Sequence, residues 1–425
     1  MRKFLIGILS VIVVDAYFFD FTLRIFPIAN SKMILAVIGA AAFLLDGMRN
    51  KEPKLSLRVI ISALLAVLFS LWCYVAITIN GTNQREFVTY FASFGTWLGG
   101  AYGVYALLRL MHERVDLLLI TRFLALVCVT QCALALLIDN FSGFRDIVNS
   151  IFLMAFDFME RGGRLYGIGC ALDPSGVRLS VVQVMIAHQL VTEKRVREKI
   201  GRSSMFILAF LTIFIIGSMI SRTTTVGTVL GLFYILMRNL FIERGGLISR
   251  RQIVLTFLLI VLVGVATGVS IYFYNTSSKF YGDLRFGLEG FFNWAETGEF
   301  RTGSTDHLQT MWVWPETQRG WIIGEGRMGV FQTNTDIGYC NYIIYCGLIG
   351  MTIYSAYYIF NHLSLIGKFR HFRFTALLLI AVTFIVWLKV TTDIFLIDAL
   401  LFCIDGDYDS GEEPEIKTEL EPETA

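Results

Sequence analysis

The stretch SMFILAFLTIFIIGSMISRTTTVGTVLGLFYILMRNLF, residues 204–241, determines the fold class of this chain. It holds two apolar runs, 204–220 and 223–241, and a helix needs roughly 17–25 such residues to cross the hydrocarbon core of a membrane. Only Ser221 and Arg222 separate the runs. Because a backbone in lipid must satisfy its own hydrogen bonds, such runs form helices. The stretch therefore predicts a tight helical hairpin in a membrane.

Apolar runs of the same kind recur along the chain. Of the 425 residues, 55% are hydrophobic and 16% are charged, and the mean hydropathy is +0.64. A soluble domain of this length could not bury so much apolar surface. Residues 374–404 are open to two interpretations, either a span at 374–388 followed by a shorter one at 391–404, or one long bent helix. The other spans are predicted near 4–19, 33–48, 59–80, 87–109, 116–138, 175–191, 204–220, 223–241, 252–274 and 337–360. We thus expect an all-α polytopic membrane protein whose transmembrane domain, residues 1–404, has about 11–12 helices.

The distribution of Lys and Arg predicts the orientation of the spans. With the N-terminus in the cytoplasm, the short cytoplasmic loops hold 20 of these residues, and the longer outer segments hold 13. Cytoplasmic loops of membrane proteins are enriched in positive charge. The first apolar run follows Arg2 and Lys3 but has no small-residue cleavage site, so we expect an uncleaved first span. The N-terminus is therefore predicted to be cytoplasmic.

Two segments predicted on the outer side, 139–174 and 275–336, are too long to be simple connections, and long loops in helical bundles often carry function. The C-terminal residues 405–425 contain nine acidic residues and one lysine, a composition typical of a disordered tail. The seven cysteines lie mostly in apolar runs without metal-ligand spacing, which predicts core packing. A disulfide between Cys170 and Cys340 is the alternative.

Arginine is unusually frequent on the predicted outer side. Its planar guanidinium holds phosphate oxygens in a bidentate manner that lysine cannot reproduce. The cluster therefore suggests an anionic lipid or a diphosphate-linked substrate, although single members could contact phospholipid headgroups instead. Ten of the 13 outer cations are arginine: Arg24, Arg85, Arg145, Arg161, Arg164, Arg222, Arg285, Arg301, Arg319 and Arg327.

Two arginines lie close to or inside apolar runs. Arg222 sits between two spans with almost no loop, where a charge faces a cavity or a partner by default because lipid solvates it poorly. We therefore interpret Arg222 as functional. Arg178 lies inside the sixth predicted span, five residues after Asp173. It could bind an anion or simply pair with Asp173.

Further candidates lie in the two long outer segments. Residues 161–175 place four glycines beside Arg161 and Arg164, which leaves backbone N–H groups open to an anion. Asp336 comes directly before the tenth span, where it could cap the helix or act as a base. His307 is a second candidate base. The nearby Trp312 and Trp314 could stack on sugars or belong to the interfacial aromatic belt.

Taken together, these motifs resemble a known family. The pattern consists of Arg164-Leu-x-Gly, Ser221-Arg222 opening a span, a late large outer loop that ends with Gly324-Glu325-Gly326, and Asp336-x-Gly-Tyr followed by Gly347-Leu-Ile-Gly350. It is similar to the bacterial O-antigen and capsular repeat-unit polymerases (Wzy-type) over about residues 160–360. The first 150 residues match only in hydropathy.

The resemblance implies a GT-C-like fold and an inverting glycosyltransferase that needs no metal or other cofactor. It would polymerise undecaprenyl-diphosphate-linked oligosaccharide at the outer face of the bacterial inner membrane. Donor, acceptor and lipid bilayer would be its partners, with a chain-length regulator protein as a further one and no nucleic acid. In this scheme Arg222, Asp336 and His307 are catalytic. The diphosphate is held by Arg161, Arg164, Arg178, Arg222, Arg301 and Arg327.

Three alternatives to a polymerase remain. The related O-antigen ligases commonly have a His-Asn pair where this chain has Thr335-Asp336, and this departure favours a polymerase. A flippase for lipid-linked oligosaccharide would need cations through both halves of the membrane. A non-catalytic scaffold would not need arginine buried near the outer face.

Overall fold

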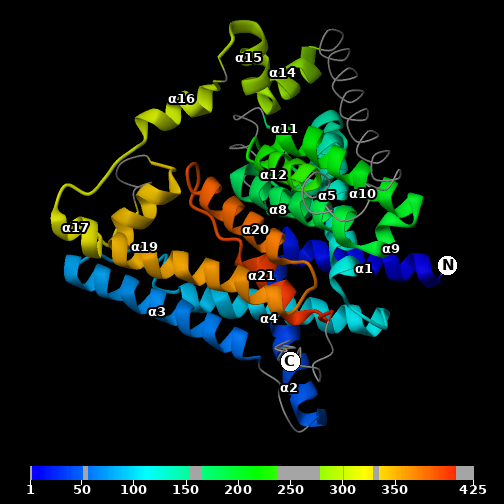
Figure 1. Ribbon diagram of the computed structural model, residues 1–425, viewed down its shortest axis with the longest axis horizontal. Helices are drawn as coiled ribbons and strands as arrows, with labels where there is room; N and C mark the ends of the chain where they lie inside the picture. The colour runs from blue at the N-terminus through cyan, green and yellow to red at the C-terminus, as the bar shows by residue number, and fades with distance from the viewer. Residues whose placement is uncertain are drawn as a thin grey trace, which may run out of the picture.

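The computed structural model describes residues 2–50, 56–153, 164–237, 278–299, 301–328 and 335–407 (Figure 1). Within these ranges almost all regular structure is helical, and the one sheet is the antiparallel hairpin of β1 (Thr22–Leu23) and β2 (Phe26–Asn30). The helices are α1 (Arg2–Phe18), α2 (Ser31–Asn50), α3 (Leu57–Asn80), α4 (Tyr90–Met111), α5 (Leu117–Asn140), α6 (Ser142–Ile151), α8 (Leu172–Thr192), α9 (Lys194–Arg197), α10 (Ile200–Thr212), α11 (Ser218–Ile220), α12 (Thr224–Met237), α14 (Ser278–Gly287), α15 (Glu289–Thr297), α16 (Gly303–Thr310), α17 (Gln318–Ile323), α19 (Gly338–Ser364), α20 (Arg373–Val386) and α21 (Phe395–Cys403).

The apolar helices confirm the predicted class of the chain. Among the described residues, five helices are long and apolar enough to cross a membrane: Ser31–Arg49, Leu57–Asn80, Leu117–Asn140, Ile200–Ile220 and Gly338–Gly367. Shorter apolar helices run over Phe4–Phe18, Thr224–Met237 and Arg373–Val386. The chain is therefore an all-α membrane-embedded protein. The exact number of spans stays a prediction, and the predicted span 252–274 lies outside the described residues.

The stretch quoted first forms the hairpin that its sequence predicts. A π-helical turn, Ile213–Gly217, joins α10 to α11, and α12 begins at Thr224 directly after the turn at 221–223. Both arms pack on α8 through small residues. A side chain at Gly227 would collide with the backbone of Ser180, and one at Gly176 would collide with Ser221. These contacts place the Arg222 turn against the start of α8.

Glycines also allow α2 to cross α4 at very short range. A Cβ atom on Gly39 would overlap the carbonyl of Gly99 and approach the amide of Gly103, and one on Gly103 would overlap the carbonyl of Leu35. In Figure 1, α2 runs steeply across the more horizontal α4 at this point. Helices in lipid associate through such small-residue contacts, because no hydrophobic gain drives apolar surfaces together there.

Residues 374–404 form a helical hairpin rather than one bent helix. The segment 387–394, called the tip below, separates α20 from α21. The start of α20 and the end of α21 return to the same end of the molecule, where Lys368 Nζ donates to the carbonyls of Leu401 and Phe402 at 2.9 and 2.7 Å. The hairpin lies between α19 and the α8–α12 pair (Figure 1).

The Gly324-Glu325-Gly326 motif of the late outer segment contacts α19 at Gly347. Gly347 breaks α19 with φ 64° and ψ −175°, which frees carbonyl groups of the preceding turn. The backbone N–H groups of Glu325 and Gly326 donate to the carbonyls of Ile344 and Tyr345 at 2.6 and 3.0 Å. The segment after α17 thus satisfies the kink in α19 and is fixed to it.

Segments that the charge distribution assigns to one side of the membrane contact one another. On the predicted outer side, the Arg24 N–H donates to the carbonyl of Ile151, and Asn80 donates to that of Gly324. On the predicted cytoplasmic side, the Val115 N–H donates to Asp405 at 2.8 Å, and Arg195 pairs with Asp116 at 2.8 Å. The fold is consistent with the predicted orientation, which remains a prediction.

Candidate functional site

Two of the arginines singled out by the sequence converge on one aromatic ring. The guanidinium carbon of Arg222 lies 4.2 Å from the ring centre of Phe286, and that of Arg164 lies 5.0 Å from the same centre. Arg164 precedes α8, Arg222 lies in the turn before α12, and Phe286 belongs to α14. In Figure 1, α14 and α15 sit above α11 and α12, and α14 contacts α11. We call this arrangement the Arg164–Arg222 site.

Arg222 is held by the chain that joins α14 to α15. Its Nε donates to the carbonyl of Phe286 at 2.7 Å, and its terminal nitrogen lies 2.6 Å from Glu289 Oε2. This oxygen is buried and receives no well-aligned hydrogen bond, so the contact is mainly Coulombic. Burial lowers the pKa of Arg222, Glu289 opposes this shift, and the charge of Arg164 adds to it.

The Arg222 turn is also connected to the tip of the α20–α21 hairpin. Asp173 Oδ1 accepts hydrogen bonds from Ser221 at 2.7 Å and Thr223 at 2.9 Å. The same oxygen lies 2.8 Å from the ammonium group of Lys389 at the tip. Lys389 was not among the residues predicted from the sequence, although a lone cation at the end of the apolar run 374–388 is the same signal that pointed to Arg222.

The site keeps a net positive charge. It contains three cations, Arg164, Arg222 and Lys389, and two carboxylates, Asp173 and Glu289, a formal excess of one positive charge. Among the described residues, no carboxylate forms an ion pair with Arg164. A phosphate oxygen could therefore bind Arg164 directly and compete with Glu289 for Arg222.

Arg178 belongs to a different cluster. It does not pair with Asp173; its terminal nitrogens lie 3.1 Å from Asp20 Oδ1 and 2.6 Å from the carbonyl of Phe18. Lys32 lies 3.3 Å from the other oxygen of Asp20. Burial alone would raise the pKa of Asp20, but the charges of Arg178 and Lys32 outweigh it and hold this pKa below its ordinary value. Arg178 is thus occupied by a structural ion pair.

The remaining predicted diphosphate ligands do not gather at the Arg164–Arg222 site. Arg301 is exposed and pairs with Glu299 and Asp306 at 3.3 and 3.1 Å. Arg327 pairs with Glu325 at 2.6 Å, beside the kink of α19. Arg161 lies outside the described residues.

Asp336 lies close to the tip but does not cap α19. Ile337 is the N-cap residue of this helix, without a side-chain cap, and the Asp336 side chain is exposed. The Tyr339 N–H donates to the carbonyl of Trp387 at 3.2 Å, and Gly338 lies against Val390. The chain at Asp336 therefore packs on the tip of the α20–α21 hairpin, the same segment whose Lys389 pairs with Asp173.

His307 and the tryptophans form a neighbouring exposed surface. His307 is exposed on α16, and the adjacent Leu308 packs on Ile337. The rings of Trp314 and Trp321 stack at 5.3 Å, with Trp312 5.5 Å from Trp314. The three rings lie together and are partly exposed. This arrangement fits both predicted roles, stacking on sugars and membership of the interfacial aromatic belt.

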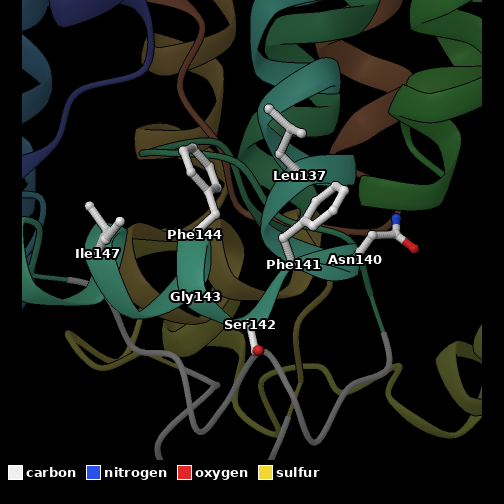
Figure 2. Close-up of a pocket in the computed structure, with 7 residues that line it drawn as sticks. All are labelled: Leu137, Asn140, Phe141, Ser142, Gly143, Phe144 and Ile147. Carbon is white, nitrogen blue, oxygen red and sulfur yellow. The ribbon is translucent and has the colours of Figure 1, made fainter.

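Other candidate features of the chain are structural or lie elsewhere. All seven cysteines are free, so Cys170 and Cys340 form no disulfide, and six of them are buried. Within the described ranges, no group of three or more His, Cys, Asp and Glu side chains is placed to hold a metal ion. The α5–α6 corner holds an open hollow of about 600 Å³. Leu137, Phe141, Phe144 and Ile147 line it (Figure 2).

The fold and this site define an all-α membrane protein with a cluster of three cations, Arg164, Arg222 and Lys389. Phe286 contacts both arginines, and Asp173 connects the Arg222 turn to Lys389. No family model matches the chain, and neither a curated protein nor a solved structure is detectably similar to it.

The ion pair between Asp173 and Lys389 should hold the tip against α8. We expect Asp173→Asn and Lys389→Met each to lower the free energy of unfolding by about 1–3 kcal/mol, because each leaves a half-buried partner unpaired. The double variant should lose less than the sum, with a coupling of about 1–2 kcal/mol.

The measurement is a double-mutant cycle of thermal or denaturant unfolding in detergent. The exposed pair Lys194–Glu198, with side chains 79% and 58% exposed, is the control and should show a coupling below about 0.5 kcal/mol. Additive effects at Asp173 and Lys389 would mean that this pair does not anchor the tip.

Proposed function

We propose that this protein is a membrane glycosyltransferase that polymerises undecaprenyl-diphosphate-linked oligosaccharide repeat units at the outer face of the bacterial inner membrane. The observation that supports it most is the convergence of Arg164 and Arg222 on Phe286 within a site of net positive charge. The resemblance of the motifs around these arginines to repeat-unit polymerases supplies the reaction class.

The proposed reaction places its charge where this site is positive. A hydroxyl of the acceptor sugar attacks the anomeric carbon of the donor, and the bond from that carbon to the diphosphate oxygen breaks with inversion. The leaving undecaprenyl diphosphate gains one negative charge, which preorganised guanidinium groups stabilise. Arg164 and Arg222 would bind its oxygens, and the salt bridge from Arg222 to Glu289 would open to admit them.

A base must accept the proton of the acceptor hydroxyl. Asp336 is the favoured candidate because its chain packs on the tip that reaches Asp173, and its exposed carboxylate is open to a sugar hydroxyl. His307 is the second candidate, on a helix that packs beside Ile337. The stacked tryptophans nearby would support the acceptor glycan through their ring faces.

The deciding experiment incubates the purified protein with a synthetic undecaprenyl-diphosphate oligosaccharide and reads the length of the glycan. We expect ladders of multiple repeat units to form in the presence of a chelator. Transfer to a lipid A acceptor without lengthening would instead indicate a ligase. Strict dependence on a divalent metal, or no glycan transfer from any offered repeat unit, would contradict the proposal.

A flippase is the second candidate function. It is favoured by one observation, the presence of ionisable side chains fully buried in the helical bundle, His362 and Asp398. In vesicles, a flippase would carry the lipid-linked oligosaccharide across the bilayer without changing its length. The same substrate therefore separates the two functions.

A further inference from the structure

A second cluster of polar side chains lies inside the bundle, where α19 meets the α20–α21 hairpin. His362 and Asp398 are both fully buried, with His362 Nδ1 2.8 Å from Asp398 Oδ1. The other ring nitrogen of His362 lies 3.3 Å from the hydroxyl of Thr383. One member comes from α19, one from α20 and one from α21, so the pair joins the hairpin to the helix behind it.

A tyrosine next to this pair reaches the tip of the α20–α21 hairpin. Tyr358, one turn before His362 on α19, donates to the carboxylate of Asp393 at the tip. Asp393 is partly exposed and also accepts from the N–H of Phe395 at 2.7 Å. The ring centres of Tyr358 and His362 are 6.2 Å apart. Tyr358 therefore lies between the tip carboxylate and the buried pair, hydrogen-bonded to Asp393 and next to the ring of His362.

Several polar atoms near the pair lack a well-aligned partner. Both side-chain atoms of Asn361, the hydroxyl of Tyr357 and Oδ2 of Asp398 are buried and receive no well-aligned hydrogen bond. Leaving such groups without well-aligned partners is costly, and the Tyr357 hydroxyl lies near both Asn361 and Asp398. The surroundings of the pair are therefore polar on the side of α19.

The number of protons on the His362–Asp398 pair sets the net charge of this buried site. A neutral imidazole beside an ionised carboxylate carries one negative charge in a site with no exposure to solvent, and an isolated buried charge is very costly. Among the described residues, Lys32 of α2 is a cation in electrostatic contact with Asp393 from a packed helix. The Asp393 carboxylate also acts on Asp398. Hydroxyls from α1, α4 and α19 face the cluster as well: Tyr17, Tyr90, Tyr342, Tyr354, Tyr357 and Tyr358.

We propose that His362 and Asp398 form a buried proton-binding site, loaded from solvent through Asp393 and Tyr358. One proton from solvent adds to the pair and gives either imidazolium with carboxylate or imidazole with carboxylic acid, and both forms are electrically neutral. Loading the proton favours the docked hairpin, whose tip carries Lys389 to Asp173. The inference does not depend on the glycosyltransferase proposal.

The test reads the protonation state of the purified protein directly. Histidine labelled with ¹⁵N reports imidazolium, and the infrared carbonyl band of a protonated carboxyl reports carboxylic acid. At neutral pH we expect one of the two signals from the pair. It should disappear in Asp398→Asn or His362→Gln, and it should persist in the control Asp46→Asn, whose carboxylate accepts from Tyr102 in a partly exposed position.

If the His362 and Asp398 variants do not fold, the signal is assigned by replacing the other four histidines, His112, His188, His307 and His371. Blocking the route with Tyr358→Phe should slow hydrogen–deuterium exchange of the pair's proton by at least about tenfold. A neutral His362 beside an ionised Asp398 at neutral pH would overturn the proposal. Unchanged exchange in Tyr358→Phe would overturn the proposed route.

Discussion

Replacing Arg222 by alanine should lower the rate of glycan polymerisation by at least about 100-fold, the usual effect of removing one preorganised donor from a charged transition state. The side chain is only 18% exposed and lies 4.2 Å from the ring centre of Phe286, so solvent cannot replace it easily. Arg222→Lys should lose about tenfold, because lysine retains the charge but not the bidentate fork. The measurement is glycan length and initial rate with a lipid-diphosphate oligosaccharide.

Arg319→Ala is the matched control for this experiment. Arg319 is also an arginine of the predicted outer side, but it is exposed and donates to the carbonyl of Ile79 at 2.9 Å, away from Phe286. Its removal should leave the rate within about twofold of the parent, as expected for an exposed polar contact. If Arg222→Ala is present in the membrane in normal amount and still makes full-length glycan, Arg222 does not bind the leaving group.

Replacing Gly227 by leucine should destabilise the folded protein by about 3 kcal/mol or more, because the added side chain meets backbone that cannot move aside. A Cβ atom there would collide with the Cα and carbonyl atoms of Ser180. The contact lies where α12 crosses α8, the two helices that start beside Arg222 and Asp173. We therefore expect a lower melting temperature, poor yield from the membrane and loss of the site together.

Gly95→Leu provides the control for that variant. Gly95 lies in α4, and a Cβ atom there meets nothing within 4 Å. The same substitution should leave stability equal or slightly raised, by up to about 1 kcal/mol, since leucine favours the helix over glycine. Equal melting temperatures for the Gly227 and Gly95 variants in detergent would show that the α8–α12 contact is looser than described.

The sequence was most informative where the lipid environment alone determines the backbone conformation. A run such as 204–220 forms a helix because no other conformation satisfies its backbone in a membrane, and the structure confirms a helix that ends at Ile220. The turn at Ser221-Arg222 follows from the short spacing of the two runs. The same reasoning could not decide between one bent helix and a hairpin over 374–404, because hydropathy does not report the direction of the chain.

The candidate site was predicted only in part. The rarity of charge near apolar runs predicted a cavity or a partner for Arg222, and the structure gives it the partner Glu289. The spacing of Arg178 and Asp173 left their pairing open, and the structure gives each a different partner, Asp20 and Lys389. Charged residues on one helix can face different neighbouring segments. Their spacing along that helix therefore does not show which segment supplies the partner of each charge.

The sequence by itself therefore predicted that this protein lies in a lipid bilayer and that its apolar runs form helices. It also identified the few polar side chains that must find partners within or beside those helices. The tertiary structure decided which partners those are: Phe286 between Arg164 and Arg222, Lys389 beside Asp173, and Asp398 beside His362. The physical reason is that apolar burial in lipid depends on local composition, whereas ion pairs and hydrogen bonds act over a few ångströms and join residues far apart in the chain.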